Sequence, residues 1–242
     1  MSTFAFRVNV PPNIIKDSRT TGFPVVHKLA FRLATFEDEE IAMDLAGTNT
    51  LKYKRTLFNR TLLESWKGKE GDPTCVKLRH HDGSSTAEYE SWHPDLRQFF
   101  GQAWNRRHEM ALNESIVDKR KMTSKGGKVV YTYTIPQAAQ DEFKATKYPI
   151  VSTVGLRIQT AEDEITAIEG CGGNPLRYMR AITAATLVQV NGEPVGDVEE
   201  AIAAWHPMLR GAMPIIAKLA QARAQVGANF FEENEEMVQI DE

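Results

Sequence analysis

Two histidine-containing segments carry residue types that bind metal ions. His108-Glu109-Met110-Ala111-Leu112 begins like the helix of zinc proteases, but that motif needs a second histidine where Leu112 stands. His80-His81-Asp82 combines imidazole and carboxylate groups. The sequence places no further ligand nearby, and a zinc site needs three or four. We therefore expect no metal ion, and interpret the two segments as an exposed helix end and a polar loop.

Two other segments could take part in catalysis or bind phosphate. Cys75 and His93 could form a nucleophile and base, but nothing in the sequence orients the histidine. Gly170-Cys171-Gly172-Gly173 is rich in glycine, yet it follows a predicted helix rather than a strand, so we interpret it as a helix end. The chain is therefore predicted not to be an enzyme and to bind no cofactor. The two cysteines, Cys75 and Cys171, are expected to be free thiols.

Two acidic triplets, Glu37-Asp38-Glu39 and Glu162-Asp163-Glu164, could supply paired carboxylates for acid–base chemistry. Each follows a threonine that can cap a helix, and carboxylates stabilise the positive end of the helix dipole. The triplets are therefore predicted to be helix starts. Arg32 and Arg157 precede them. Each arginine could tie its strand to the acidic turn of its own module or present its planar fork to a partner.

The elements that position these residues occur twice in the chain. A shift of 125 positions aligns residues 4–62 with residues 129–187 without a gap. The identities include Arg32/Arg157, Thr35/Thr160, the acidic triplets, Gly47/Gly172, Tyr53/Tyr178 and Arg55/Arg180. A shift of 113 then aligns Trp92-His93-Pro94 with Trp205-His206-Pro207. A repeat of this length indicates a duplicated domain rather than a solenoid.

The duplication suggests how the 242 residues are divided. We predict a first module at 1–117, a basic linker at 118–128, a second module at 129–228 and an acidic tail at 229–242. Each module is long enough to close its own core. Trp92 and Trp205 stand at the same place in both modules, where they could anchor the core or contact a partner.

Each module is predicted to have an α+β fold, with a β-hairpin followed by about three helices. Alternating residues indicate a first strand that ends at Pro11 or Pro136. We expect a polar loop of a dozen residues next, and then a second strand at about 25–33 or 150–158. Helices should follow at the two threonines and at the two Trp-His-Pro motifs, with a helix between them whose apolar face includes Leu51. Asn191-Gly192 indicates a small hairpin in the second module.

The charge distribution separates the two halves. Residues 1–128 carry a net charge of +5 and the remainder carries −8. Lys52 and Arg55 lie on one predicted helix with Lys54 and Arg60, and further basic residues follow at 106–107 and 119–121. Such a patch attracts phosphate, so nucleic-acid binding by the first module is an alternative function. No apolar run is long enough to span a bilayer, and no membrane association is expected.

The order of these elements resembles a known family. Phe31-Arg32-Leu33-Ala34-Thr35-Phe36-Glu37-Asp38-Glu39 and its counterpart at 156–164 look like the L-R-x-x-T-x-x-[D/E]-E helix start of the tail assembly chaperones of long-tailed bacteriophages and related baseplate-assembly proteins. The resemblance implies a non-enzymatic protein that engages tape measure, tail tube or baseplate subunits. Self-association is a further alternative. The resemblance also implies a location in the host cytoplasm during assembly, or in the virion if the protein is a permanent baseplate or hub subunit.

Overall fold

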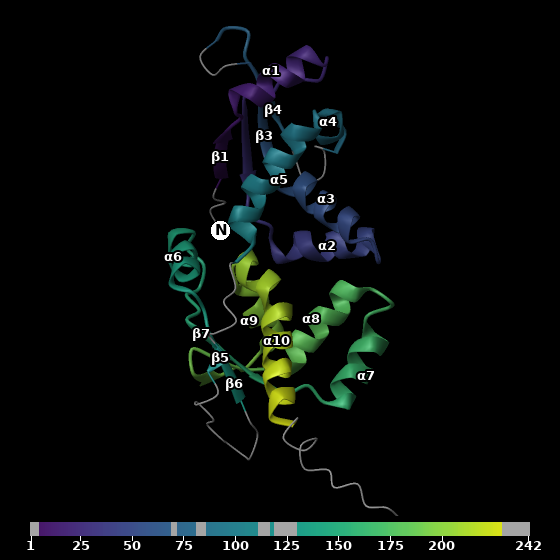
Figure 1. Ribbon diagram of the computed structural model, residues 1–242, viewed down its shortest axis with the longest axis vertical. Coiled ribbons are helices and arrows are strands. Elements are labelled where there is room, and N and C mark those ends of the chain that lie inside the picture. The colour runs from purple at the N-terminus through teal and green to yellow at the C-terminus, as the bar shows by residue number, and fades with distance from the viewer. Residues whose placement is uncertain (1–4, 69–71, 81–85, 111–116, 119–129, 229–242) are drawn as a thin grey trace, which may run out of the picture. The chain divides into compact units, whose positions relative to one another are not determined.

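The computed structural model describes residues 5–68, 72–80, 86–110, 117–118 and 130–228. The chain divides into two compact units (Figure 1). Unit 1 contains the N-terminal part of the chain through Met110, together with two short segments, Gly173–Leu176 and Ala204–Gly211. Unit 2 contains the other described residues. Most of the predicted linker and all of the predicted acidic tail lie outside the described residues.

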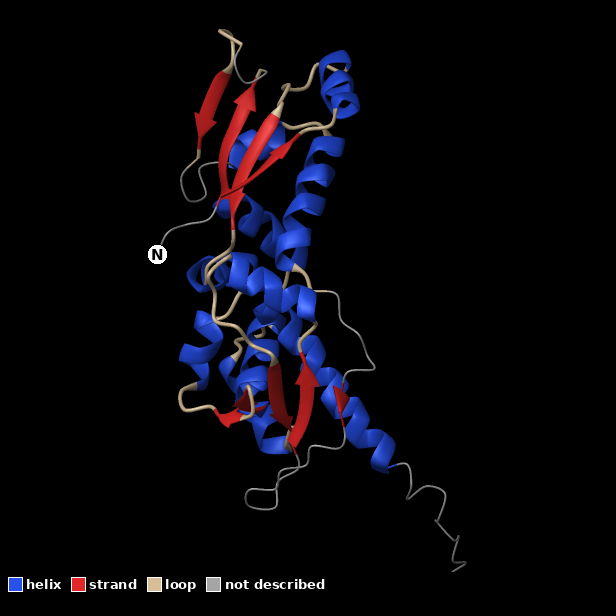
Figure 2. Ribbon diagram, turned by 90° about the vertical axis from the view of Figure 1, so that its left-hand side faces the viewer, coloured by secondary structure: helices blue, strands red, loops and turns tan. Residues whose placement is uncertain are grey.

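Unit 1 is built on a four-stranded antiparallel sheet in the order β1-β2-β3-β4. Its elements are β1 (Ala5–Asn9), α1 (Pro12–Thr20), β2 (Lys28–Arg32), α2 (Phe36–Ala46), α3 (Thr50–Thr61), β3 (Leu62–Lys67), β4 (Val76–Arg79), α4 (Thr86–Ser91) and α5 (Pro94–His108). Figure 2 shows these strands grouped together with helices packed beside them.

The second repeat of the sequence forms an antiparallel sheet in the order β5-β6-β7-β8-β9. Its elements are β5 (Val117–Asp118), β6 (Val130–Thr134), α6 (Gln137–Ala145), β7 (Thr153–Arg157), α7 (Ala161–Gly170), α8 (Pro175–Thr186), β8 (Leu187–Val190), β9 (Glu193–Pro194), α9 (Val198–Ala204) and α10 (Pro207–Ala228). The first turns of α8 and α10 belong to unit 1 and the remainder of each helix to unit 2.

The two sheets share one hydrogen-bonding register. Ala5 pairs with Arg32 between β1 and β2, and Val130 pairs with Arg157 between β6 and β7, 125 positions later. The next strand pair has a register shift at Ala30/Phe31 in one repeat and at Gly155/Leu156 in the other. Because a slip of one residue would turn every side chain to the opposite face, a shared register and a shared bulge show the same sheet in both repeats. The α+β prediction is confirmed.

The loop predicted after the first strand is wrong. Pro11 and Pro136 do end their strands, but helices α1 and α6 begin immediately after them. The fixed φ angle of proline suits the first turn of a helix. Ile14 of α1 and Phe143 of α6 are buried, so each short helix has an apolar side that packs on its unit.

The sheet and helix content also exceeds the prediction of a hairpin and about three helices. The second predicted helix turns directly into a strand at Leu62 and Leu187, which adds β3 and β8 to the two sheets. The short helices α4 and α9 give too few turns for an apolar periodicity to be recognised. Leu51, expected on an apolar face, is 80% exposed. The Asn191-Gly192 hairpin is confirmed, with both residues at positive φ between β8 and β9.

Each predicted helix start at a threonine is confirmed as a capping box. The Thr35 hydroxyl accepts from the Asp38 backbone N–H at 3.1 Å, and Asp38 Oδ2 accepts from the Thr35 N–H at 2.9 Å. Thr160 and Asp163 repeat this arrangement at the start of α7. Two orphan donors are satisfied in each helix, so the acidic triplets are helix starts, as predicted.

An aromatic cluster fills the interior of unit 1. The Phe58 ring lies 5.5 Å from Phe100 and 5.1 Å from Trp104, and Phe31 lies 5.6 Å from Phe100. The Trp104 indole N–H donates to the Thr61 hydroxyl at 2.9 Å, which satisfies a buried polar group. This core fixes α3 and α5 against the sheet and thereby sets the positions of the surface residues described next.

Candidate functional site

Arg32 ties β2 to the start of α2. Its guanidinium donates through Nη1 and Nη2 to the two carboxylate oxygens of Asp38, and through Nη1 to the Leu33 carbonyl at 3.0 Å. Arg60 Nε donates to the same carboxylate at 2.9 Å. Burial alone would raise the pKa of Asp38, but the hydrogen bonds from Arg32 and Thr35 lower it below its usual range. Arg32 therefore has the structural role that was one of its two predicted alternatives.

Arg157 makes the same connection in the second repeat. Its Nη1 and Nη2 donate to Asp163 at 2.6 and 2.7 Å. The hydrogen bond from Arg157 holds the pKa of Asp163 far below its usual range. The helix-start motif that carries the family resemblance is therefore held together inside each repeat by one arginine fork and one capping box.

Trp92 and Trp205 lie in the interior. Trp92 is fully buried, its ring packs 5.9 Å from Phe100, and its indole N–H donates to Glu88 at 3.3 Å. Trp205 is 3% exposed. The interpretation of these two residues as partner-facing is corrected, because a ring enclosed by its own fold has no surface to offer. The alternative that they anchor the core describes the structure.

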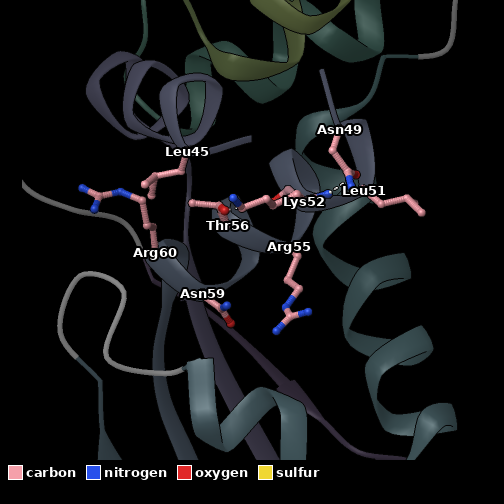
Figure 3. A pocket seen from close by; sticks show the side chains of 8 residues that line it. All are labelled: Leu45, Asn49, Leu51, Lys52, Arg55, Thr56, Asn59 and Arg60. Carbon is pink, nitrogen blue, oxygen red and sulfur yellow. Dashed lines mark hydrogen bonds between the residues drawn. The ribbon is translucent and has the colours of Figure 1, made fainter. Parts of the chain in front are cut away.

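Lys52 and Arg55 line an open groove on unit 1 with a volume of about 530 Å³. Figure 3 shows them on α3 with Arg60, below Leu45 at the end of α2. Arg55 forms an ion pair with Glu90, and Arg60 is held by Asp38. Two of the three cations are thus neutralised locally. The structure brings Lys52 and Arg55 together as predicted, while Arg106 and Arg107 lie on α5 and residues 119–121 fall outside the described part.

One face of α2 is covered within unit 1. Leu33 is 6% exposed, Glu39 7% and Met43 2%. The segment Ala204–Gly211 supplies Arg210, whose guanidinium donates to Glu39 at 2.8 to 3.1 Å and to the Ala34 carbonyl at 2.9 Å. The segment Gly173–Leu176 supplies Asn174, whose amide donates to the Met43 carbonyl at 3.0 Å. This face of α2 is a packed, polar-and-apolar interface.

The equivalent face of α7 is bare. A shift of 125 positions places Ile158, Glu164 and Ile168 where Leu33, Glu39 and Met43 stand. Ile158 is 37% exposed and Ile168 is 60% exposed, and Ile165 between them is 57% exposed. The inner side of the helix is unaffected, since Ala42 and Ala167 are buried alike. We call Ile158, Glu164, Ile165 and Ile168 the α7 face.

Sequence reasoning missed the α7 face because it relied on the residues that the two repeats share. The signal lies in a difference between them. Ile165 replaces Glu40, and Ile165 and Ile168 stand three residues apart on the exposed side of α7. Large apolar side chains that are exposed side by side mark an interaction surface, whereas single exposed apolar side chains are common on any protein.

The segments first considered for chemistry have local contacts. The expectation of an exposed helix end at His108 is wrong, because its side chain is buried and its Nε2 accepts from the Ala34 N–H at 3.0 Å. His80 Nε2 lies 3.1 Å from the Ser65 hydroxyl, and no cluster of three or more possible ligands occurs among the described residues. Cys75 Sγ contacts the Gly68 carbonyl at 3.5 Å. Gly172 and Gly173 have positive φ just after α7, which is the helix end that was predicted. Residues 81–82 and 111–112 lie outside the described part. None of the described helices has the length and apolar composition needed to cross a bilayer.

Comparisons with known proteins give no relative. No protein-family model, no curated protein and no solved structure matches this chain.

Proposed function

We propose that this chain is a non-enzymatic assembly protein of a long-tailed bacteriophage, acting through protein–protein contacts as a tail assembly chaperone or as a baseplate or hub subunit. The α7 face carries this proposal. Three of its four residues stand where unit 1 has a buried interface, and it exposes Ile158 and Ile168 where unit 1 buries Leu33 and Met43. The resemblance of the two helix-start motifs to tail assembly proteins supplies the biological setting.

Protein binding at this face has a physical basis. Burying apolar side chains contributes about 25 cal/mol per Å² removed from water, and three isoleucines on α7 and the loop before it form a compact anchor. Glu164 lies among them and gives the surface a charge that selects a basic partner. An apolar centre with polar and charged groups around it is the usual anatomy of a protein–protein interface.

Affinity capture tests this function. The full chain, tagged and expressed in phage-infected cells, is expected to recover tape measure, tail tube or baseplate proteins. Ile165→Asp/Ile168→Asp should fail to recover them, because two carboxylates would have to be buried. Ile215→Asp, a matched change at an exposed isoleucine of α10, should retain them. Recovery of the same proteins by all three chains, or of no tail protein by any, would contradict the proposal.

Two forms of the function can be separated by their presence in the finished particle. A chaperone acts transiently and should be absent from purified virions. A baseplate or hub subunit should be present at a fixed stoichiometry. Quantitative mass spectrometry of purified particles distinguishes them.

The open groove on unit 1 favours nucleic-acid binding as a second candidate. Lys52, Arg55 and Thr56 line it together, and such groups contact phosphates. Lys52→Glu/Arg55→Glu should then weaken binding of a labelled oligonucleotide and reduce the slope of log affinity against log salt by about one for each phosphate that is no longer neutralised. Binding with no salt dependence, or unchanged in the variant, would exclude this role.

A further inference from the structure

We propose that copies of this chain associate head to tail, with the first repeat of one copy seated on the α7 face of the next. This inference rests on the proposed function as an assembly protein and names the partner of the α7 face. The occupant consists of two segments of the second copy, Thr48–Leu51 and Ser91–Gln98. We call these two segments the docking segments.

The docking segments are the counterparts of the two segments that cover α2. Thr48–Leu51 corresponds to Gly173–Leu176 through the shift of 125, and Ser91–Gln98 corresponds to Ala204–Gly211 through the shift of 113. Gly173–Leu176 and Ala204–Gly211, which we call the covering segments, pack inside unit 1. The chain thus contains one complete contact, in which these two segments cover α2. It also carries a second copy of each side of that contact: the docking segments and the α7 face.

The second copies of both sides are exposed. In the covering segments Pro207, Met208 and Arg210 are buried. Their counterparts Pro94 and Asp95 are exposed and Arg97 is half-buried. Leu51 is 80% exposed, the highest value among the exposed large apolar residues described in the structure. The docking segments and the α7 face therefore each expose apolar surface that the equivalent contact would bury.

One pair of charges on the two exposed sides is complementary. Arg210 pairs with Glu39 in unit 1, and their counterparts are Arg97 and Glu164. An arginine fork directed at a carboxylate fixes the register of a contact as well as its partner. Asn49 is the counterpart of Asn174, and both cap a helix through Oδ1: Asn49 accepts from the Lys52 N–H and Asn174 from the Leu176 N–H, each at 2.9 Å. Its amide group can therefore donate to a carbonyl at the end of α7, as Asn174 does to Met43.

The docking segments differ from the covering segments at five of their twelve positions, and one of these changes puts a charge in place of a buried apolar side chain. Asp95 stands where Met208 is buried. The contact between chains buries less apolar surface than the contact inside unit 1, so it forms and dissociates with concentration rather than permanently. Because the two sides are different surfaces, the association is heterologous and builds an open row or a closed ring.

Sedimentation velocity of the purified full chain over a concentration series tests this inference. The wild-type chain is expected to shift from monomer to dimers and longer species. Glu164→Arg and Arg97→Glu should each weaken self-association about tenfold or more, because like charges then meet in the contact. Glu162→Arg, the same charge change at an exposed position of the first turn of α7, should leave it unchanged.

Mixing two disabled variants gives the decisive result. The Arg97→Glu chain keeps an intact α7 face, and the Ile165→Asp/Ile168→Asp chain keeps intact docking segments. Each variant should therefore stay monomeric by itself, and the two should form a 1:1 dimer when mixed. The double variant Glu164→Arg/Arg97→Glu should regain association, since the charges are exchanged and again opposite.

The outcome separates this inference from the proposed function. A wild-type chain that stays monomeric at every concentration, or self-association unaffected by Glu164→Arg and Arg97→Glu, overturns the head-to-tail contact. If the α7 face variants still fail to capture tail proteins in that case, the proposed function stands and its partner is a different protein. Self-association through the α7 face without capture of tail proteins supports this inference and contradicts the phage setting.

Discussion

Replacement of Arg210 by methionine should destabilise the chain far more than the same change at Arg97. Arg210 and Glu39 are 8% and 7% exposed. The guanidinium of Arg210 donates to both oxygens of Glu39 and to the carbonyls of Ala34 and Trp205. Methionine keeps most of the apolar stem but leaves a buried carboxylate and two carbonyls without their charged donor.

Removing one partner of a buried ion pair costs about 3–5 kcal/mol, and we expect Arg210→Met to lie in that range. Arg97 is half-buried and stands at the equivalent position of the first repeat, where the change should cost within about 0.5 kcal/mol. The double variant Glu39→Met/Arg210→Met should recover a large share of the stability, because both members of the buried ion pair are then replaced by apolar side chains.

Urea denaturation followed by circular dichroism measures these differences at low protein concentration, where self-association does not contribute. Equal midpoints for Arg210→Met and Arg97→Met would refute the reasoning. That result would mean that the Glu39 carboxylate is solvated without Arg210, so that the covered face of α2 is not a buried interface.

The packing and the charges support three more expectations. Trp92→Ala should cost about 3–5 kcal/mol, because the side chain is fully buried; a decrease under about 1 kcal/mol in thermal or urea denaturation would contradict its place in the core. Burial lowers the pKa of His108 from 6.5 to about 3, so the folded state binds fewer protons than the unfolded state. This histidine should therefore contribute a loss of stability of about 1.4 kcal/mol per pH unit as pH drops below 6.5, and His206, whose pKa burial also lowers to about 3, should add a similar loss. His108→Gln should remove its own share of the slope, and an unchanged slope would disprove the assignment. Gly155→Ala should cost about 1–3 kcal/mol of stability, because a Cβ at 155 would lie 2.9 Å from Val130 Cγ1 and from Gln189 Cβ. Alanine stands at the equivalent position 30 in the first repeat. An unchanged urea midpoint would contradict this expectation and show that β6 and β8 move apart to accept the methyl group.

Local interactions made part of the fold predictable. The capping boxes at Thr35 and Thr160 depend on residues three positions apart, so their side chains meet whatever the rest of the chain does. The Asn191-Gly192 hairpin depends on two residues that tolerate positive φ. The α1 and α6 helices were missed because their starts at Pro11 and Pro136 were interpreted only as strand ends.

The amino-acid sequence by itself determined that one α+β module occurs twice, with its helix starts, its strand ends and its Trp-His-Pro helices in the same order. The tertiary structure alone decided which surfaces are covered. Glu39 and Glu164 end the same Glu-Asp-Glu triplet at the start of a capped helix, yet one is buried against Arg210 and the other is exposed. Burial depends on segments more than a hundred residues away, and the periodicity of a single helix carries no information about them.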